Sequence, residues 1–239
     1  INDMAPFTGT AFMTTKAVVE EGITRLGNCF LYSFGELKEI VLPSTVTEIG
    51  SKAFEYCVKL ADIEFGSANI QLGESAFRDC DSLTEIQIHA GITLSRYSFY
   101  SCDNLKRVWI DCAAVPMNAF EFCSGMTELV LTDRVKTIGS RAFGQCQSLI
   151  SVTLPETLTE ISESCFYGCE KLEKIDFPES LQIIGKSAFS GCGFTQVDIP
   201  GSITMQENAF SNCKKLEWVK LDCEVVPRNA FSGCSALTE

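Results

Sequence analysis

Histidine is almost absent from this chain, which contains one, His89, among 239 residues. A histidine base is the usual proton acceptor in nucleophilic and general acid–base catalysis, so such a mechanism would depend on this one side chain. His89 follows an alternating apolar segment and is interpreted as a solvated residue at the end of a strand. The chain also has no Gly-x-x-x-x-Gly-Lys, Gly-x-Gly-x-x-Gly or Gly-x-Ser-x-Gly motif. The sequence therefore predicts no catalytic residue, no cofactor and no enzyme activity.

Basic residues are also scarce, with 19 Lys and Arg against 31 Asp and Glu and a formal net charge of −12. Nucleic acids and anionic membranes both require clustered Lys and Arg on the protein that binds them. The acid excess therefore argues against either as a partner.

Long apolar runs are missing as well, although 46% of the residues are hydrophobic. No run approaches the roughly 18 residues of a membrane span, and no basic-then-apolar signal peptide opens the chain. We expect no membrane insertion by this chain. Because its first residue is Ile1 rather than Met, we interpret it as a piece of a longer product whose targeting segment is not in view.

Phenylalanine, in contrast, recurs through almost the whole chain at intervals of 21 to 24 residues. A small residue precedes each of these phenylalanines, which are Phe30, Phe54, Phe77, Phe99, Phe120, Phe143, Phe166, Phe189, Phe210 and Phe231. In all units but the first, a cysteine follows three residues later: Cys57, Cys80, Cys102, Cys123, Cys146, Cys169, Cys192, Cys213 and Cys234. A repeat of this length indicates stacked units that bury their apolar residues against one another.

Most of these cysteines precede an apolar-x-x-apolar-x-apolar pattern, as in Leu60, Ile63 and Phe65. Its last two apolar positions alternate with polar ones, which is the period of a half-buried strand. Proline, as at Pro43 and Pro155, then ends the strand because it has no amide hydrogen. We predict a repeat solenoid, mainly β, of about ten units, with short parallel strands on one face and irregular or short helical return segments. The phenylalanines and cysteines of the repeat would form its structural core.

The segment from Leu37 to Cys57 reads Leu-x-x-Ile-x-Leu-Pro-x-x-Val-Thr-x-Ile-Gly-x-x-Ala-Phe-x-x-Cys. This pattern resembles the BspA-like leucine-rich repeats, a bacterial type of surface leucine-rich repeat. The resemblance implies a leucine-rich repeat solenoid over residues 18–239, which stops within a further unit. Residues 1–17 are interpreted as an N-terminal cap or a degenerate unit. The first unit departs from the pattern, with Ser33 at the expected cysteine position.

Nine of the 13 cysteines occupy the same position of the repeat. Zinc sites need closely spaced ligand pairs, so uniform spacing of this length matches no zinc signature. Free cysteine behaves as a small buried hydrophobe, and we predict a column of reduced, structural thiols and no metal. Disulfides or a metal site are the alternatives, and the odd count leaves at least one thiol unpaired in any case.

The side chains between the inward positions of each strand must point away from the core, and both tryptophans of the chain fall at such outward positions. An exposed tryptophan beside an arginine is the composition of an interface hot spot. We predict two binding patches on the strand face. The first comprises Gln87, Arg107, Trp109, Glu128 and Val130, and the second comprises Trp218 and Lys220.

Three hypotheses of function follow. The leading one is a recognition module that binds a protein or a glycan through its strand face. The family resemblance implies a cell-surface or secreted location and, for some members, adhesion to host matrix proteins. The second is a structural stalk that presents another domain. The third is a carbohydrate-active enzyme, because Asp176 and Asp198 would take the same outward position in consecutive units, about 5 Å apart.

Overall fold

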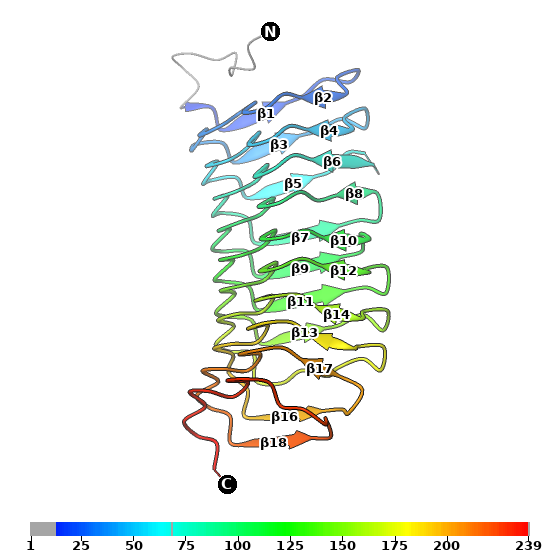
Figure 1. Cartoon of the computed structure of the whole chain (residues 1–239). Coiled ribbons are helices and arrows are strands. Elements are labelled where there is room, and N and C mark those ends of the chain that lie inside the picture. Colours follow the sequence, from blue (N-terminus) through cyan, green and yellow to red (C-terminus); the bar gives the residue numbers. More distant parts are fainter. Residues whose placement is uncertain (1–12, 68, 239) are drawn as a thin grey trace.

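The computed structural model describes residues 13–67 and 69–238, which form one parallel β-solenoid. Its turns are stacked along a single axis, with β1 (Lys16–Val18) in the first described turn and β18 (Trp218–Leu221) in one of the last at opposite ends of the stack (Figure 1). The described residues contain eighteen strands and no α-helix. This confirms the predicted repeat solenoid, and of the two expected forms of return segment, irregular or short helical, the described residues show the irregular one.

The first strand column contains the predicted strands, which carry the apolar-x-apolar pattern. They alternate between exposed and buried side chains because successive residues of a strand point to opposite faces. The column consists of β1 (Lys16–Val18), β3 (Glu39–Val41), β5 (Asp62–Glu64), β7 (Glu85–Ile88), β9 (Arg107–Ile110), β11 (Glu128–Leu131), β13 (Ser151–Thr153), β16 (Gln196–Ile199) and β18 (Trp218–Leu221).

A second strand column, beside the predicted one, was not expected. It is formed by the segments that correspond to Glu48–Ile49 in each turn, most of which pair in parallel with the neighbouring turn, as in the register of Ile49 with Leu72 (Figure 1). Its strands are β2 (Arg25–Leu26), β4 (Glu48–Ile49), β6 (Ile70–Leu72), β8 (Ile92–Thr93), β10 (Ala114–Val115), β12 (Thr137–Ile138), β14 (Glu160–Ile161), β15 (Ile183–Ile184) and β17 (Thr204–Met205). Glycine follows several of these strands because the neighbouring turn is close: a Cβ on Gly73 would lie 2.3 Å from the Ser51 nitrogen.

Strand pairing is interrupted in both columns, but at different turns. The first column lacks pairing between β5 and β7, and again around residues 173–177, which form no strand. The second column lacks it between β8 and β10 and between β12 and β14. At each of these interruptions the strands of the other column are paired. For example, β6 pairs with β8 beside the interruption between β5 and β7, and β7 pairs with β9 beside the interruption between β8 and β10.

The return side of each turn is built from residues in the left-handed region of backbone conformation. The residues two before and two after each core phenylalanine have positive φ, as at Tyr97 (60°) and Ser101 (58°) around Phe99. This geometry aims every second amide at the next turn, so that Lys52, Phe54 and Tyr56 donate hydrogen bonds of 2.8–2.9 Å to carbonyls 22 residues further along the chain. A third set of inter-turn hydrogen bonds therefore closes the solenoid without a helix.

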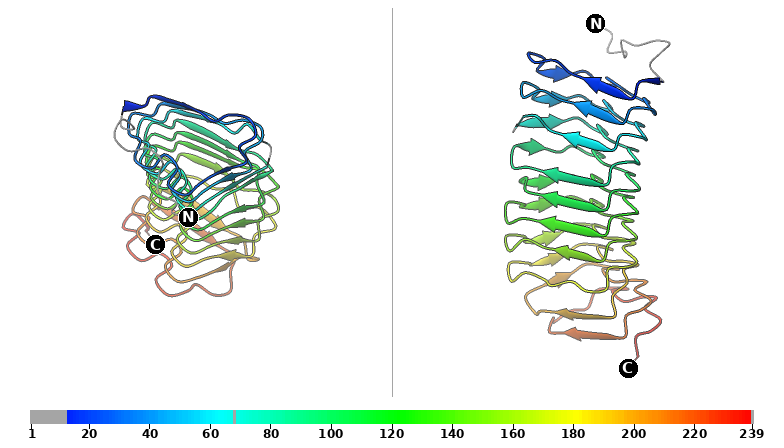
Figure 2. Two further views of the ribbon diagram at one scale, coloured as in Figure 1. Left: turned by 90° about the horizontal axis from the view of Figure 1, so that it is seen from above. Right: turned by 180° about the vertical axis from the view of Figure 1, so that it is seen from behind.

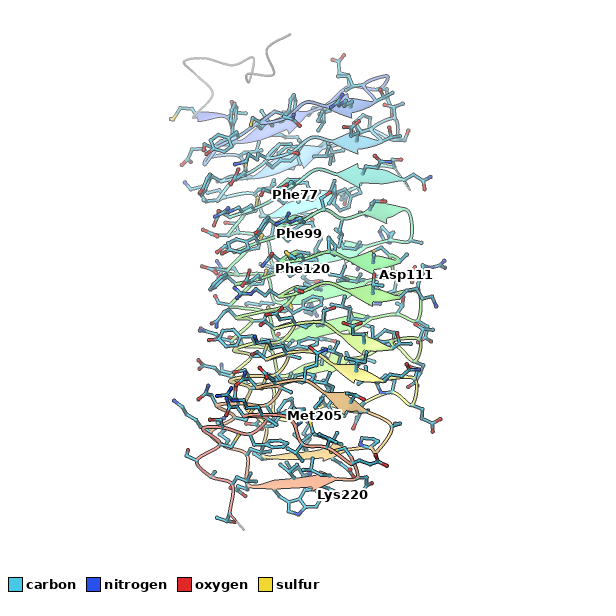
Figure 3. The ribbon with its side chains drawn as sticks, viewed as in Figure 1. Phe77, Phe99, Asp111, Phe120, Met205 and Lys220 are labelled. Atoms are coloured by element: carbon cyan, nitrogen blue, oxygen red, sulfur yellow. The ribbon has the colours of Figure 1, made fainter. Side chains whose placement is uncertain are left out.

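The interior contains the predicted column of phenylalanines. Their rings stack with centroids 5.0–5.7 Å apart from Phe54 through Phe231, and Figure 3 shows Phe77, Phe99 and Phe120 one above the other. All are fully buried except Phe231 in the last turn, which is half-buried. Seen from above, successive turns lie one behind another (Figure 2), and the buried phenylalanines lie within them.

The nine repeat cysteines are buried beside this column, as predicted. Each thiol donates a hydrogen bond of 3.1–3.4 Å to the main-chain carbonyl of the turn before it: in eight of them to the core phenylalanine, as Cys146 does to Phe120. All 13 cysteines are free thiols. The small size and weak donor of a thiol explain why cysteine occupies this position.

The first turn shows a register different from that of the sequence alignment. Leu31, not Phe30, donates to the Ala53 carbonyl and accepts from the Cys57 thiol, so it occupies the position of the core phenylalanine. Phe34, which is buried, then stands at the cysteine position that was assigned to Ser33. The interval to Phe54 becomes 23 residues, the commonest spacing of the repeat.

Strand β1 lies across the predicted boundary at residue 18 and pairs with β3 from Lys16 onward. Residues 1–12 of the predicted cap lie outside the described residues. The solenoid that follows positions every candidate site residue on a regular scaffold.

Candidate functional site

Three neighbouring strands of the first column bring the first predicted patch together. Parallel pairing sets Arg107 between Glu85 and Glu128, and Trp109 between Gln87 and Val130. The inward residues of the same strands, such as Val108, are buried and hold the strands against the core. All five predicted residues of this patch therefore lie side by side on one outward face.

This face is hollowed at the patch. Glu85, Gln87, Arg107, Trp109, Glu128 and Val130 line a shallow depression of about 400 Å³. Ile86 and Val108 also border it, but their side chains are buried and face the core. Trp109 and Val130 provide the apolar side chains of the depression, and polar and charged groups surround them, which is the usual composition of a recognition site.

Arg107 is held by acidic neighbours. Its Nη2 donates a hydrogen bond to Oε1 of Glu85, and this bond raises the pKa of Arg107. Glu128 raises that pKa further but forms no ion pair with a described residue. The guanidinium is thereby fixed in place while one carboxylate beside it stays available to a ligand.

Trp109 is the large exposed aromatic of the patch, with 36% of its surface accessible. The ring of His89 lies 6.4 Å from it in an edge-on arrangement. His89 is exposed at the end of β7, as expected, but its contact with Trp109 makes it a member of the patch that the sequence did not reveal. The sequence contained a signal for this contact, because a residue that directly follows a strand lies beside the outward side chains of the neighbouring strand.

The second predicted patch is separate from the first. Trp218, 51% exposed, begins β18, which pairs with β16 in a different sheet. Lys220 extends from this strand near the C-terminal end of the stack (Figure 3). Its Nζ forms ion pairs with Asp198 at 3.0 Å and Asp222 at 3.5 Å, and the Asp198 carboxylate raises the pKa of Lys220.

Strand pairing does not assemble the carboxylate row of the enzyme hypothesis. Asp176 lies in residues 173–177, which form no strand, so no strand pairing places it beside Asp198. Asp198 forms an ion pair with Lys220 at 3.0 Å. The pairing therefore gives no support to the paired arrangement that acid–base chemistry on a sugar requires.

An acidic stretch adjoins the first patch toward the N-terminus. Glu39, Asp62 and Glu64, together with Leu42 and Phe65, line a second depression of about 270 Å³. Glu39 pairs with Lys16 at 2.8 Å, whereas Asp62 and Glu64 form no ion pair with a described residue. The outward columns of the sequence contained these residues, but nothing in the sequence showed that their carboxylates stay unpaired.

A cluster of aromatic side chains on the return side was also missed. The Tyr100 ring lies 5.4 Å from Phe122 and 5.5 Å from Tyr97, and the Arg78 guanidinium lies 4.7 Å above it. Phe122 has a φ of 64°, at a position where later turns carry Gly168 or Gly191. The sequence contained one signal for this cluster, namely the bulky Phe122 at a position of the repeat that favours glycine.

Within the described part of the chain no helix has the length and apolar character needed to cross a membrane. The same residues contain no group of three or more His, Cys, Asp or Glu side chains arranged to hold a metal ion.

The chain matches the sequence profile of the BspA type leucine rich repeat region over residues 7–114 and 113–238. Among solved structures it is similar to a leucine-rich repeat protein from Eubacterium ventriosum, with 25% identity and a TM-score of 0.62 over 76% of this chain and 59% of that one. It is also similar to a leucine rich cell surface protein from Faecalibacterium prausnitzii, with 22% identity and a TM-score of 0.53 over 94% of this chain and 78% of that one. No curated protein matches the chain. Since the profile covers nearly all of the sequence, the chain belongs to the BspA type leucine-rich repeat family.

Proposed function

We propose that this chain is a non-catalytic recognition module that binds its ligand through the outward face of the first strand column. The observation that carries the proposal is the exposed Trp109 beside Arg107, which is paired with Glu85, in a depression of about 400 Å³. Aromatic and arginine side chains dominate the binding energy of interfaces, and here both stand on strands anchored by a rigid core.

The proposed location is the cell surface or the extracellular space. The family and the printed description of the Faecalibacterium prausnitzii protein as a cell surface protein support it. The proposed partners are a protein, host matrix proteins among them, or a glycan. Trp218 and Lys220 form a second proposed contact site, although the ion pairs of Lys220 leave mainly the Trp218 ring to a ligand.

A binding screen tests this function. The wild type and the Arg107→Ala/Trp109→Ala variant are compared on immobilised extracellular matrix proteins and on a glycan array. Binding that is lost in the variant, by a few kcal/mol as expected for a hot spot, supports the proposal.

The matched control is Tyr167→Ala/Lys186→Ala, which removes an exposed aromatic and a cation at residues that line neither strand-face depression. Equal affinity in wild type and the strand-face variant would overturn the site assignment. Strand-face substitutions that are silent, with no ligand in either screen, would favour the stalk hypothesis.

A further inference from the structure

The outward face of the first column carries an excess of negative charge over β1 to β13. Its outward positions hold the cations Lys16 and Arg107 and the carboxylates Glu39, Asp62, Glu64, Glu85 and Glu128. Lys16 and Arg107 are neutralised within the face by Glu39 and Glu85. Three carboxylates, those of Asp62, Glu64 and Glu128, remain without an ion pair among the described residues.

These carboxylates lie on both sides of Trp109. Asp62 and Glu64 are on β5, Trp109 is on β9, and Glu128 is on β11. β5 and β11 are three turns apart. Paired strands of neighbouring turns are about 4.8 Å apart, and β6 and β8 pair beside the interruption between β5 and β7, so three turns correspond to about 14 Å, which four residues of extended chain span. The first depression lies between these ends, over β7 to β11, and the second lies at the β5 end, over β3 and β5.

We propose that the occupant of this face is a basic, extended segment of a partner protein that lies along the solenoid axis. Cationic side chains would contact Asp62 and Glu64 at one end and Glu128 at the other. A cation or an aliphatic stem between them would rest against the Trp109 ring, an interaction that exposed tryptophan favours. This inference rests on the proposed function, because it names the partner of the same surface.

Charge complementarity selects this occupant. Unpaired carboxylates attract a cationic segment and repel an acidic one, and they add no net attraction for a neutral glycan. The formal net charge of −12 for the whole chain acts in the same direction at longer range.

Fluorescence titration tests the inference. The chain has two tryptophans, so Trp218→Phe leaves Trp109 as the sole tryptophan reporter. The probe is a synthetic repeat of Lys-Ser-Gly-Ser, and the comparison peptides carry acetyl-lysine or glutamate in place of lysine. We expect saturable binding of the lysine peptide alone, with an affinity that falls about tenfold as the salt concentration rises from roughly 50 to 300 mM.

The charge-removing variant is Asp62→Asn/Glu64→Gln, made in the same background. We expect it to weaken binding of the lysine peptide by about tenfold, since it removes one contact site and leaves the fold unchanged. The control pair is Glu156→Gln/Glu160→Gln, two exposed carboxylates outside the strand-face depressions, which should leave the affinity unchanged. The control pair changes the net charge of the protein by the same amount as Asp62→Asn/Glu64→Gln. A difference between the two variants therefore distinguishes a local contact with the peptide from a long-range effect of the net charge.

Failure of this inference differs from failure of the proposed function. No binding of the lysine peptide, equal binding of the acetylated peptide, or equal effects of the two charge variants would overturn the basic partner. A glycan or neutral protein whose binding depends on Arg107 and Trp109 would still support a recognition module. Absence of any Trp109-dependent binding in both experiments would overturn both.

Discussion

The Cys80 thiol donates a hydrogen bond of 3.2 Å to the carbonyl oxygen of Phe54, one turn earlier in the solenoid. The same bond recurs between neighbouring turns through Cys234. The Phe54 carbonyl also accepts a hydrogen bond of 3.1 Å from the Cys57 amide, so the thiol uses its second acceptor position. Cysteine is therefore a linking residue between turns as well as a filler of space.

Thiol labelling tests this role. Burial raises the pKa of Cys57 to about 12 and shifts those of Cys80 and Cys102 in the same direction. The hydrogen bond with the Cys213 thiol instead lowers the pKa of Cys234, in the last turn, to about 7. We expect Cys234 and the half-buried Cys29 and Cys223 to react with a thiol reagent first at neutral pH. The other ten buried thiols should react only after denaturation, and rapid labelling of most of them in the native protein would contradict the buried column.

Phe143→Ala should destabilise the fold by about 3–5 kcal/mol, because it leaves a cavity in a fully packed column. The Phe143 ring stacks between Phe120 and Phe166, with centroids 5.6 Å away on each side. Phe231→Ala is the matched control, since this ring is half-buried and its substitution should cost less. Urea unfolding measures both, and equal losses would mean that burial in the column does not set the cost.

Ser101→Gly should stabilise the protein by up to about 1 kcal/mol, because an L-residue is strained in the left-handed region and glycine is not. Ser101 has a φ of 58°. Ser148, which is similarly half-buried, is not among the residues with positive φ. Ser148→Gly should therefore destabilise the protein by about 0.5–1 kcal/mol. Thermal unfolding of the two variants would show shifts in opposite directions, and a common sign would refute the strain argument.

Glu121→Gln should raise stability at neutral pH. Burial raises the pKa of Glu121, against the opposing effects of Asn118 and Arg141, so the ionised carboxylate is disfavoured in the folded state. A carboxyl whose pKa is higher in the folded state binds its proton more tightly there, and wild-type stability is lost as the pH rises through its titration. The advantage of the variant should thus disappear below about pH 4. A constant difference from pH 3 to 8 would exclude this electrostatic cause.

Much of the fold was predictable because the repeat enforces it. The spacing of the phenylalanines identified the stacked core, and alternation along each strand identified the outward columns that contain Arg107 and Trp109. The register of the first turn was not predictable, because Phe30 and Leu31 are both apolar and either can be aligned with the core position. Only the inter-turn hydrogen bonds of Leu31 decide between them.

Features that depend on contacts between neighbouring turns could not be predicted from the sequence. Two-residue strands such as Glu48–Ile49 are too short to show a period, so the second column became visible only through its pairing. The unpaired state of Asp62 and Glu64 is likewise a property of what lies beside them. A repeat sequence specifies the contents of one turn better than the relations between turns.

The staggered interruptions of the two strand columns have a mechanical consequence. At every boundary between turns at least one column is hydrogen-bonded, and the phenylalanine stack continues from Phe54 through Phe231. No two neighbouring turns are held together by side-chain packing alone, so a force along the axis would have to break strand hydrogen bonds at any boundary between turns. A ligand held on the strand face of one segment would therefore be supported by the hydrogen bonds and ring contacts that join that segment to the rest of the stack.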